Sequence, residues 1–168
     1  MVGQRGSTWF LAGVGVAGGG TAKRTCPIPE DKVLYFPVVN NVNINAPNVC
    51  GQGPQNDPVA KLRDLSRAAT DAATNLLVEV DGKAIRNLQR VRSRVFEVAL
   101  PEDNVFDQFC SVPAGVYSPA VDDGFYVALQ PLETGNHTLH IHSDNPTQDV
   151  FYQLTVVPVL LSGRRSED

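Results

Sequence analysis

The stretch Phe125–Ser143, FYVALQPLETGNHTLHIHS, decides the fold class of this chain. It begins with FYVALQPL, a run of aromatic and branched apolar residues of the kind that favours strands. It ends with HTLHIHS, in which polar and apolar residues alternate with the period of a half-buried strand. The residues between them, ETGN at 133–136, include typical turn formers. The stretch therefore predicts two strands joined by a turn.

Segments of the same character recur along the rest of the chain. Further strands are predicted at residues 32–40, 77–80, 83–85, 94–100 and 149–161. The dipeptide Asp81-Gly82 is a strong signal for a hairpin turn between two of them. Pro37 lies inside the strand at 32–40, and because proline has no N–H to donate, that strand should lie at a sheet edge or break there. The NNVNIN segment that follows alternates as a half-buried strand or an ordered loop would.

A single helix is predicted in this pattern. Asn56 or Asp57 can cap it, with Pro58 at its first position. Apolar residues then recur at helical spacing, namely Leu62, Leu65, Ala69, Ala72 and Ala73. We therefore expect a mainly β fold, an antiparallel β-sandwich of jelly-roll or immunoglobulin-like type, with one inserted α-helix at about 58–75. One domain should span residues 7–160, followed by a polar C-terminal tail at 161–168.

The N-terminal stretch STWFLAGVGVAGGG, residues 7–20, superficially resembles a secretion signal because Arg5 precedes an apolar run. A signal peptide also needs an uninterrupted apolar core and a small-residue cleavage site. This run contains Gly13 and Gly15, starts with Trp9 and has no A-x-A site. We expect it to form the first strand, at about 8–16, ending in a glycine turn, and we expect no signal peptide within this chain.

Composition limits the classes of partner. The 168 residues are 42% hydrophobic and 19% charged, with 14 Gly and 12 Pro, which suits a turn-rich β domain. The net charge is −4 and there is no basic stripe, so nucleic acid is not an expected partner. No apolar run approaches the roughly 20 residues that span a bilayer, so no membrane span is expected.

Three cysteines occur, at positions 26, 50 and 110. None belongs to a CxxC or CxxH pair, so zinc sites of the usual spacing are absent from the sequence. In an oxidising compartment one disulfide and one thiol are expected. Cys26 and Cys50 are the preferred pair because they flank one strand-and-loop unit. Cys110 is then left unpaired or available to another chain.

Several segments together resemble a bacterial family of secreted β-rich proteins of uncharacterised function. They are WFLAG, RTCPIP, KVLYFPVVN, LVEVDGKAIRNLQRVRSRVFEVALPEDN, AGVYSPAVDDGFYVALQPLETGNHTLHI and DVFYQLTV. The resemblance covers about residues 8–157. It implies an extracytoplasmic, mainly β domain and a signal peptide upstream of this chain, and it implies no reaction.

The strongest candidate site lies in the His-x-His of the strand at 137–143. His140 and His142 share one face of an extended strand, with Cα atoms about 7 Å apart. Two imidazoles so placed can hold one metal ion, with copper, zinc or calcium as candidates. His137 has the other parity or lies in the turn. A third ligand would come from elsewhere, and the candidates are Asp122, Asp123, Asp144 and Asp149.

The alternative is that these histidines belong to an ordinary solvated or half-buried sheet face. Acidic turns, PEDN at 101–104, VDDG at 121–124 and SDNPTQD at 143–149, carry the oxygen ligands that suit calcium but are also common turn residues. No nucleophile elbow or dinucleotide fingerprint occurs.

The leading interpretation is a non-enzymatic extracytoplasmic β-sandwich that acts in binding or in self-assembly, pairing with copies of itself through strand edges. A metal-binding protein or metal-dependent enzyme that uses the histidine strand is the second. A carbohydrate-binding module is the third, with Trp9, Tyr35, Tyr117 and Tyr126 as the candidate aromatics.

Overall fold

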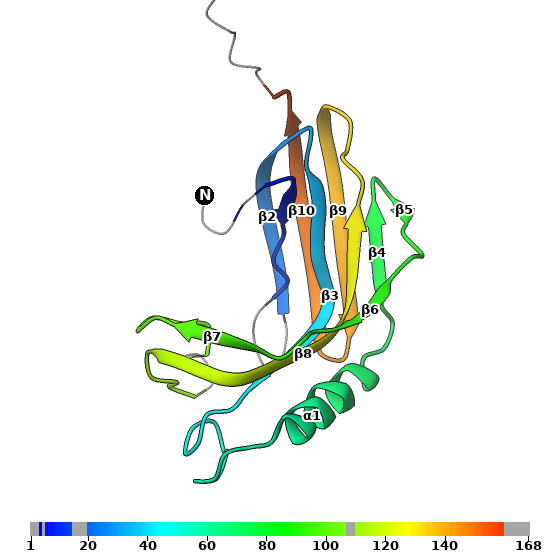
Figure 1. The fold of residues 1–168 in the computed structure, drawn as a ribbon. Helices are drawn as coiled ribbons and strands as arrows, with labels where there is room; N and C mark the ends of the chain where they lie inside the picture. Colours follow the sequence, from blue (N-terminus) through cyan, green and yellow to red (C-terminus); the bar gives the residue numbers. More distant parts are fainter. Residues whose placement is uncertain (1–3, 5, 15–19, 107–109, 160–168) are drawn as a thin grey trace, which may run out of the picture.

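The computed structural model describes residues 4, 6–14, 20–106 and 110–159, which form two β-sheets and one helix (Figure 1). The first, the β3–β8 sheet, contains β1 (Thr8–Phe10), β3 (Val33–Ile44), β8 (Gly115–Leu129), β6 (Gln89–Arg92) and β7 (Phe96–Leu100). The second, the β9–β10 sheet, contains β2 (Gly20–Pro29), β10 (Thr147–Val157), β9 (Gly135–Asp144), β4 (Leu77–Val80) and β5 (Lys83–Ala84).

The two sheets pack against each other through one hydrophobic core. Leu34, Phe36 and Val127 come from the β3–β8 sheet, and Leu139 and Ile141 come from the β9–β10 sheet. In β9 and β10 buried and more exposed positions alternate, as expected when one face of a sheet packs against the core and the other faces solvent. The predicted class, mainly β and sandwich-like with one helix, is confirmed.

Each sheet also contains one parallel pair, so the sheets are mixed rather than purely antiparallel. β1 runs parallel to β3, and β2 runs parallel to β10. The opening stretch forms two strands as predicted, β8 and β9, but they belong to different sheets. The turn-rich residues 130–134 therefore connect the two layers rather than closing a hairpin.

β3 is central in its sheet, and the position of Pro37 explains how a proline fits there. The register between β3 and β8 shifts between Pro37 and Val39. On the other side of β3, pairing with β1 ends at Tyr35, where its carbonyl accepts a hydrogen bond from the Leu11 N–H. The missing N–H of Pro37 therefore coincides with a bulge. The expectation of an edge strand or a break at Pro37 is not met, because β3 runs unbroken from Val33 to Ile44 between β1 and β8.

β8 continues beyond this bulge to carry a projecting arm, which consists of β7 and residues 115–120 of β8 (Figure 1). Gly124 lies opposite Asn40 next to the bulge. A Cβ atom at Gly124 would lie 2.6 Å from the Val39 carbonyl oxygen and 2.7 Å from the Asn40 Cβ. Only glycine permits this close approach of the two strands.

The helix α1 (Val59–Asp71) packs against β8 and β3, below the bend of β8 in Figure 1. It is shorter than the predicted range of 58–75, and its buried face differs from the predicted apolar stripe. Leu62, Ser66 and Thr70 are the buried positions, whereas Leu65 is 47% exposed. The reason is polar docking: the Asn43 side chain donates to the Ser66 hydroxyl, and the Thr70 hydroxyl donates to the Asp123 carbonyl.

The Asp81-Gly82 hairpin is confirmed: it joins β4 to β5, with both residues at positive φ. The first strand, expected at 8–16, ends at Phe10 because the chain then turns to contact β10. There the Tyr152 hydroxyl donates a hydrogen bond to the Ala12 carbonyl, and the Gln148 side-chain oxygen accepts one from the Val14 N–H. The predicted glycine turn and the tail at 161–168 lie wholly or mostly outside the described residues.

The part of the chain that the structure describes contains no helix with the length and hydropathy needed to cross a bilayer.

Candidate metal centre

Strand β9 places His140 and His142 on the outer face of the β9–β10 sheet. Leu139, Ile141 and Ser143, which alternate with them, are buried in the other direction. The register sets His142 opposite Asp149 of β10, and it sets His140 opposite Glu79 of β4. The predicted shared face is confirmed, and we call it the histidine face.

The two imidazoles converge on one carboxylate oxygen. The Nε2 of His140 lies 2.6 Å from the Oδ1 of Asp149, and the Nδ1 of His142 lies 3.3 Å from the same oxygen. One donor atom from each of these three residues lies within 4.8 Å of the others. They form the one group of this kind among the described residues.

The two distances from Asp149 to the imidazole nitrogens are close to what a metal ion requires. In a tetrahedral zinc site with bonds near 2.1 Å, neighbouring ligand atoms are about 3.4 Å apart. The Asp149–His142 distance of 3.3 Å already matches, and the Asp149–His140 distance of 2.6 Å would have to open by about 0.8 Å. An ion between the three atoms would replace the hydrogen bonds that they make in its absence.

The site is half-buried and partly immobilised. The side chains of His140 and His142 are 23% and 30% exposed. The His140 ring stacks on Phe151, with ring centroids 4.2 Å apart and planes inclined by 8°. This stacking restricts the imidazole, while the exposure leaves the site open to ions in solvent.

Carboxylates surround the two rings. Besides Asp149, Glu79 approaches His140, and Asp144 approaches His142. The hydrogen bond from His140 lowers the pKa of Asp149, and the hydrogen bond from Asn75 lowers the pKa of Asp144. Both carboxyl groups are therefore ionised at neutral pH, which favours a cation at this face.

The donor set distinguishes between the predicted metals. Imidazole nitrogens suit zinc, copper, nickel and iron, whereas calcium takes six to eight oxygen ligands. Two histidines and one aspartate leave room for water or another ligand to complete the coordination. The arrangement therefore fits a borderline transition-metal ion, and it does not fit calcium.

His137 does not belong to this cluster. Its Nδ1 lies 2.7 Å from Asp81 Oδ2, and its Nε2 lies 2.9 Å from the Glu133 carbonyl oxygen. The hydrogen bond to Asp81, with that to Glu133, raises the pKa of His137. This histidine joins the β4–β5 turn to the segment before β9, as its opposite parity suggested.

Of the four candidate third ligands, the structure brings Asp149 and Asp144 to the histidines. Asp149 lies inside β10 rather than in a loop. Asp123 is instead a structural ion, because its carboxylate pairs with Arg90 and Arg92. Sequence reasoning missed Glu79, although the alternation in LVEV could have placed it on a solvent-facing position.

The predicted disulfide is wrong. Cys50 is bonded to Cys110, with Cα atoms 5.1 Å apart, and Cys26 is a half-buried free thiol in β2. Cys26 and Cys50 are close in sequence, but β2 and β3 belong to different sheets. The loop after β3 meets the segment before β8, and these are the two segments that the bond joins.

The four candidate carbohydrate-binding aromatics do not form a platform. Trp9 is buried at 5% exposure, and the Tyr117 hydroxyl donates to the Pro113 carbonyl. Tyr35 and Tyr126 stack on each other, with centroids 5.3 Å apart, so each covers one face of the other. Burial and Asp122 raise the pKa of Tyr126, whose hydroxyl bonds to that aspartate. Burial of Trp9 and the mutual stacking of Tyr35 and Tyr126 therefore remove the aromatic faces that a sugar ring would need from three of the four candidates.

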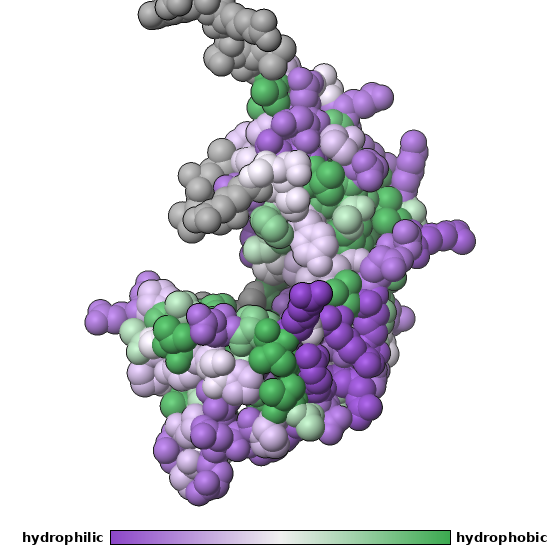
Figure 2. Space-filling view, in the orientation of Figure 1, coloured by the Kyte–Doolittle hydropathy of each residue, from purple (hydrophilic) through white to green (hydrophobic). Residues whose placement is uncertain are grey.

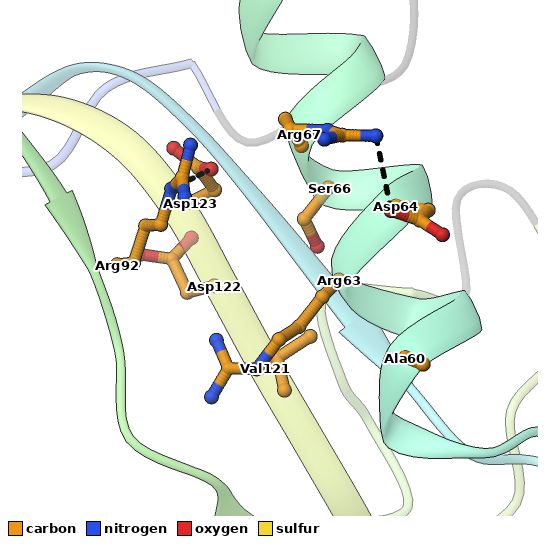
Figure 3. A pocket seen from close by; sticks show the side chains of 9 residues that line it. All are labelled: Ala60, Arg63, Asp64, Ser66, Arg67, Arg92, Val121, Asp122 and Asp123. Atoms are coloured by element: carbon orange, nitrogen blue, oxygen red, sulfur yellow. Dashed lines mark hydrogen bonds and ion pairs between the residues drawn. The ribbon is translucent and has the colours of Figure 1, made fainter.

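A small cleft between α1 and β8 gathers three arginines, Arg63, Arg67 and Arg92 (Figure 3). Arg92 pairs with Asp123 and Arg67 pairs with Asp64, as the dashed lines show. Arg63 donates to the Ser93 carbonyl. Because these cations already have partners, the cleft acts as a junction between helix and sheet.

A groove of about 720 Å³ lies beside the arm, and its lining includes none of His140, His142 and Asp149. Phe96, Val98 and Leu100 of β7 line it together with Val42 and Val105. Figure 2 shows hydrophobic side chains on the arm, where Val116 is 65% exposed. The metal candidate and the apolar groove are therefore separate features.

Comparison of the chain with models of protein families, with curated proteins and with solved structures yields no match. The resemblance to secreted bacterial proteins stays a prediction.

Proposed function

We propose that the protein is an extracytoplasmic β-sandwich that binds one divalent transition-metal ion at His140, His142 and Asp149. The observation that carries the proposal is the convergence of two imidazole nitrogens on one carboxylate oxygen. Ordinary surface histidines have no need to share a single acceptor. The Cys50–Cys110 disulfide supports an oxidising compartment outside the cytoplasm.

Binding is favoured over catalysis by where the site lies. The histidine face is an open sheet surface, whereas enzyme sites are usually concave. The large groove beside the arm has none of the three histidines in its lining.

The test is calorimetric titration of tag-free protein with Zn²⁺, Cu²⁺, Ni²⁺ and Ca²⁺. We expect one transition-metal ion per chain and no calcium binding. His140→Ala and His142→Ala should weaken the binding by more than about 100-fold, beyond what changes outside the ligand set produce. His137→Ala is the matched control, because the His137 ring makes its hydrogen bonds with Asp81 and the Glu133 carbonyl, outside the proposed site. Absence of stoichiometric binding, or equal binding by all three variants, would overturn the proposal.

The arm supports a second candidate, self-association with another copy of this chain. Within the described residues β7 pairs with β8 alone, so one edge of it is open, and Val95 and Val116 are exposed nearby. An open strand edge with apolar neighbours favours strand addition. Sedimentation velocity at rising concentration should show dimers or larger species that Val116→Glu reduces and Gln55→Glu does not. A strict monomer would contradict it.

A further inference from the structure

Each imidazole of the histidine face has a second carboxylate on its far side. The Nδ1 of His140 lies 3.5 Å from Glu79 Oε2, and the Nε2 of His142 lies 3.0 Å from Asp144 Oδ1. The nitrogens that face Asp149 are the other two, Nε2 of His140 and Nδ1 of His142. The two rings thus present different atoms to the shared centre.

We infer that Glu79 and Asp144 are positioning residues that fix the two metal-bound histidines in opposite tautomers. In the metal-bound protein His140 carries its proton on Nδ1, the nitrogen that faces Glu79, while Nε2 gives up its hydrogen bond to Asp149 and binds the metal. In the same state His142 carries its proton on Nε2 and donates it to Asp144, while Nδ1 exchanges its contact with Asp149 for the metal. The inference rests on the proposed function.

The strand geometry explains why the tautomers must differ. The two side chains leave β9 in the same direction, with ring centroids 6.2 Å apart and planes inclined by 51°. Asp149 is reached by both rings, so the rings must approach it with different edges. A carboxylate on the remaining nitrogen selects the tautomer, orients the ring and increases its basicity toward a metal.

Both outer carboxylates are held by the fold. Glu79 is fixed by the pairing of β4 with β9, which sets it opposite His140. Asp144 accepts a hydrogen bond from the Asn75 side chain, and its backbone N–H donates to the Thr74 carbonyl, 3.0 Å away. Asn75 has a positive φ of 52°, in the short segment between α1 and β4. The segment between α1 and β4 therefore holds Asp144 in place beside His142.

The first experiment measures the tautomers by long-range ¹H–¹⁵N NMR of the Zn²⁺-loaded protein. We expect His140 to be metal-bound at Nε2 with a proton on Nδ1, and His142 to show the reverse. The same tautomer at both rings would overturn the inference, even where zinc binds with unit stoichiometry.

The second experiment measures zinc affinity in Glu79→Gln and Asp144→Asn. We expect each to raise the Kd by about 10–100-fold with the stoichiometry unchanged. Glu97→Gln on the exposed side of β7 is the control and should leave the Kd unchanged. Asp144→Glu, which keeps the carboxylate, should recover part of the affinity. Loss without such recovery, or full affinity in both variants, would contradict the assigned roles.

The two proposals fail in different ways. Absence of zinc binding by the unmodified chain would overturn both. Zinc binding that depends on His140, His142 and Asp149 but not on Glu79 or Asp144 would leave the proposed function intact. It would overturn only the positioning roles of Glu79 and Asp144.

Discussion

The carboxylate of Asp123 and the guanidinium of Arg90 form a two-point ion pair between β8 and β6. The Nε–Oδ1 distance is 2.8 Å and the Nη2–Oδ2 distance is 3.2 Å. The Asp123 side chain is 4% exposed, whereas Arg90 is 28% exposed, and Arg90 also reaches Asp71 at the end of α1. These contacts, Asp123 first, raise the pKa of Arg90. One buried carboxylate thus connects two strands and the helix.

Replacement of this carboxylate should be costly. Asp123→Asn keeps the shape but points a neutral amide at two arginines, so we expect a loss of about 2–4 kcal/mol in the free energy of unfolding. Urea denaturation measures it. Asp64→Asn breaks only an exposed pair with Arg67 and should cost less than about 0.5 kcal/mol. Equal stability of the two variants would contradict the structural role of Asp123.

Addition of one methyl group at Gly124 should also destabilise the fold. The new Cβ would meet backbone atoms of Val39 and Asn40, which belong to a paired strand and have little freedom to move. We expect Gly124→Ala to cost about 1–3 kcal/mol, the usual range for overpacking. Gly53→Ala, where a Cβ meets no atom within 4 Å, is the control and should change stability little. Thermal unfolding of the two variants compares them.

The Cys50–Cys110 disulfide of the structure and the Cys26–Cys50 pairing expected from the sequence can be distinguished by peptide mapping. Peptide mapping of the oxidised protein should recover Cys50 linked to Cys110, and one thiol, Cys26, should react after unfolding. Cys50→Ser with Cys110→Ser opens a loop with a sequence separation of 60 and should cost about 2–4 kcal/mol. Cys26→Ser should cost far less. A Cys26–Cys50 peptide would show that the structure has the wrong pairing.

The His137–Asp81 pair predicts a pH window of extra stability. The raised pKa of His137 contributes stability that is complete below its ordinary value of 6.5 and lost as the pH rises through the folded value. The lowered pKa of Asp81 contributes stability that is present above 3.8 and lost as the pH falls through its folded value.

The contribution of this pair should therefore be largest between pH 3.8 and 6.5. The difference in unfolding free energy between the unmodified chain and His137→Gln, measured across pH, should peak in that window and shrink above it. A difference that grows from pH 6 to pH 9 would have the wrong sign.

The sequence by itself determined the local features of this protein. Alternation in HTLHIHS placed His140 and His142 on one face, because side chains alternate along any extended strand. Asp81-Gly82 specified its turn, because both positions need positive φ. The helix was found from its spacing, although the buried face was not, because Ser66 and Thr70 are buried by hydrogen bonds to another element.

Only the tertiary structure decided which distant segments meet. The partner of Cys50 is 60 positions away, and the partners of the histidines, Asp149 and Glu79, lie on two other strands. Such pairings depend on strand order and register, which are set by the packing of whole sheets rather than by neighbouring residues. The sequence supplied the two imidazoles, and the fold supplied the carboxylate on which they converge.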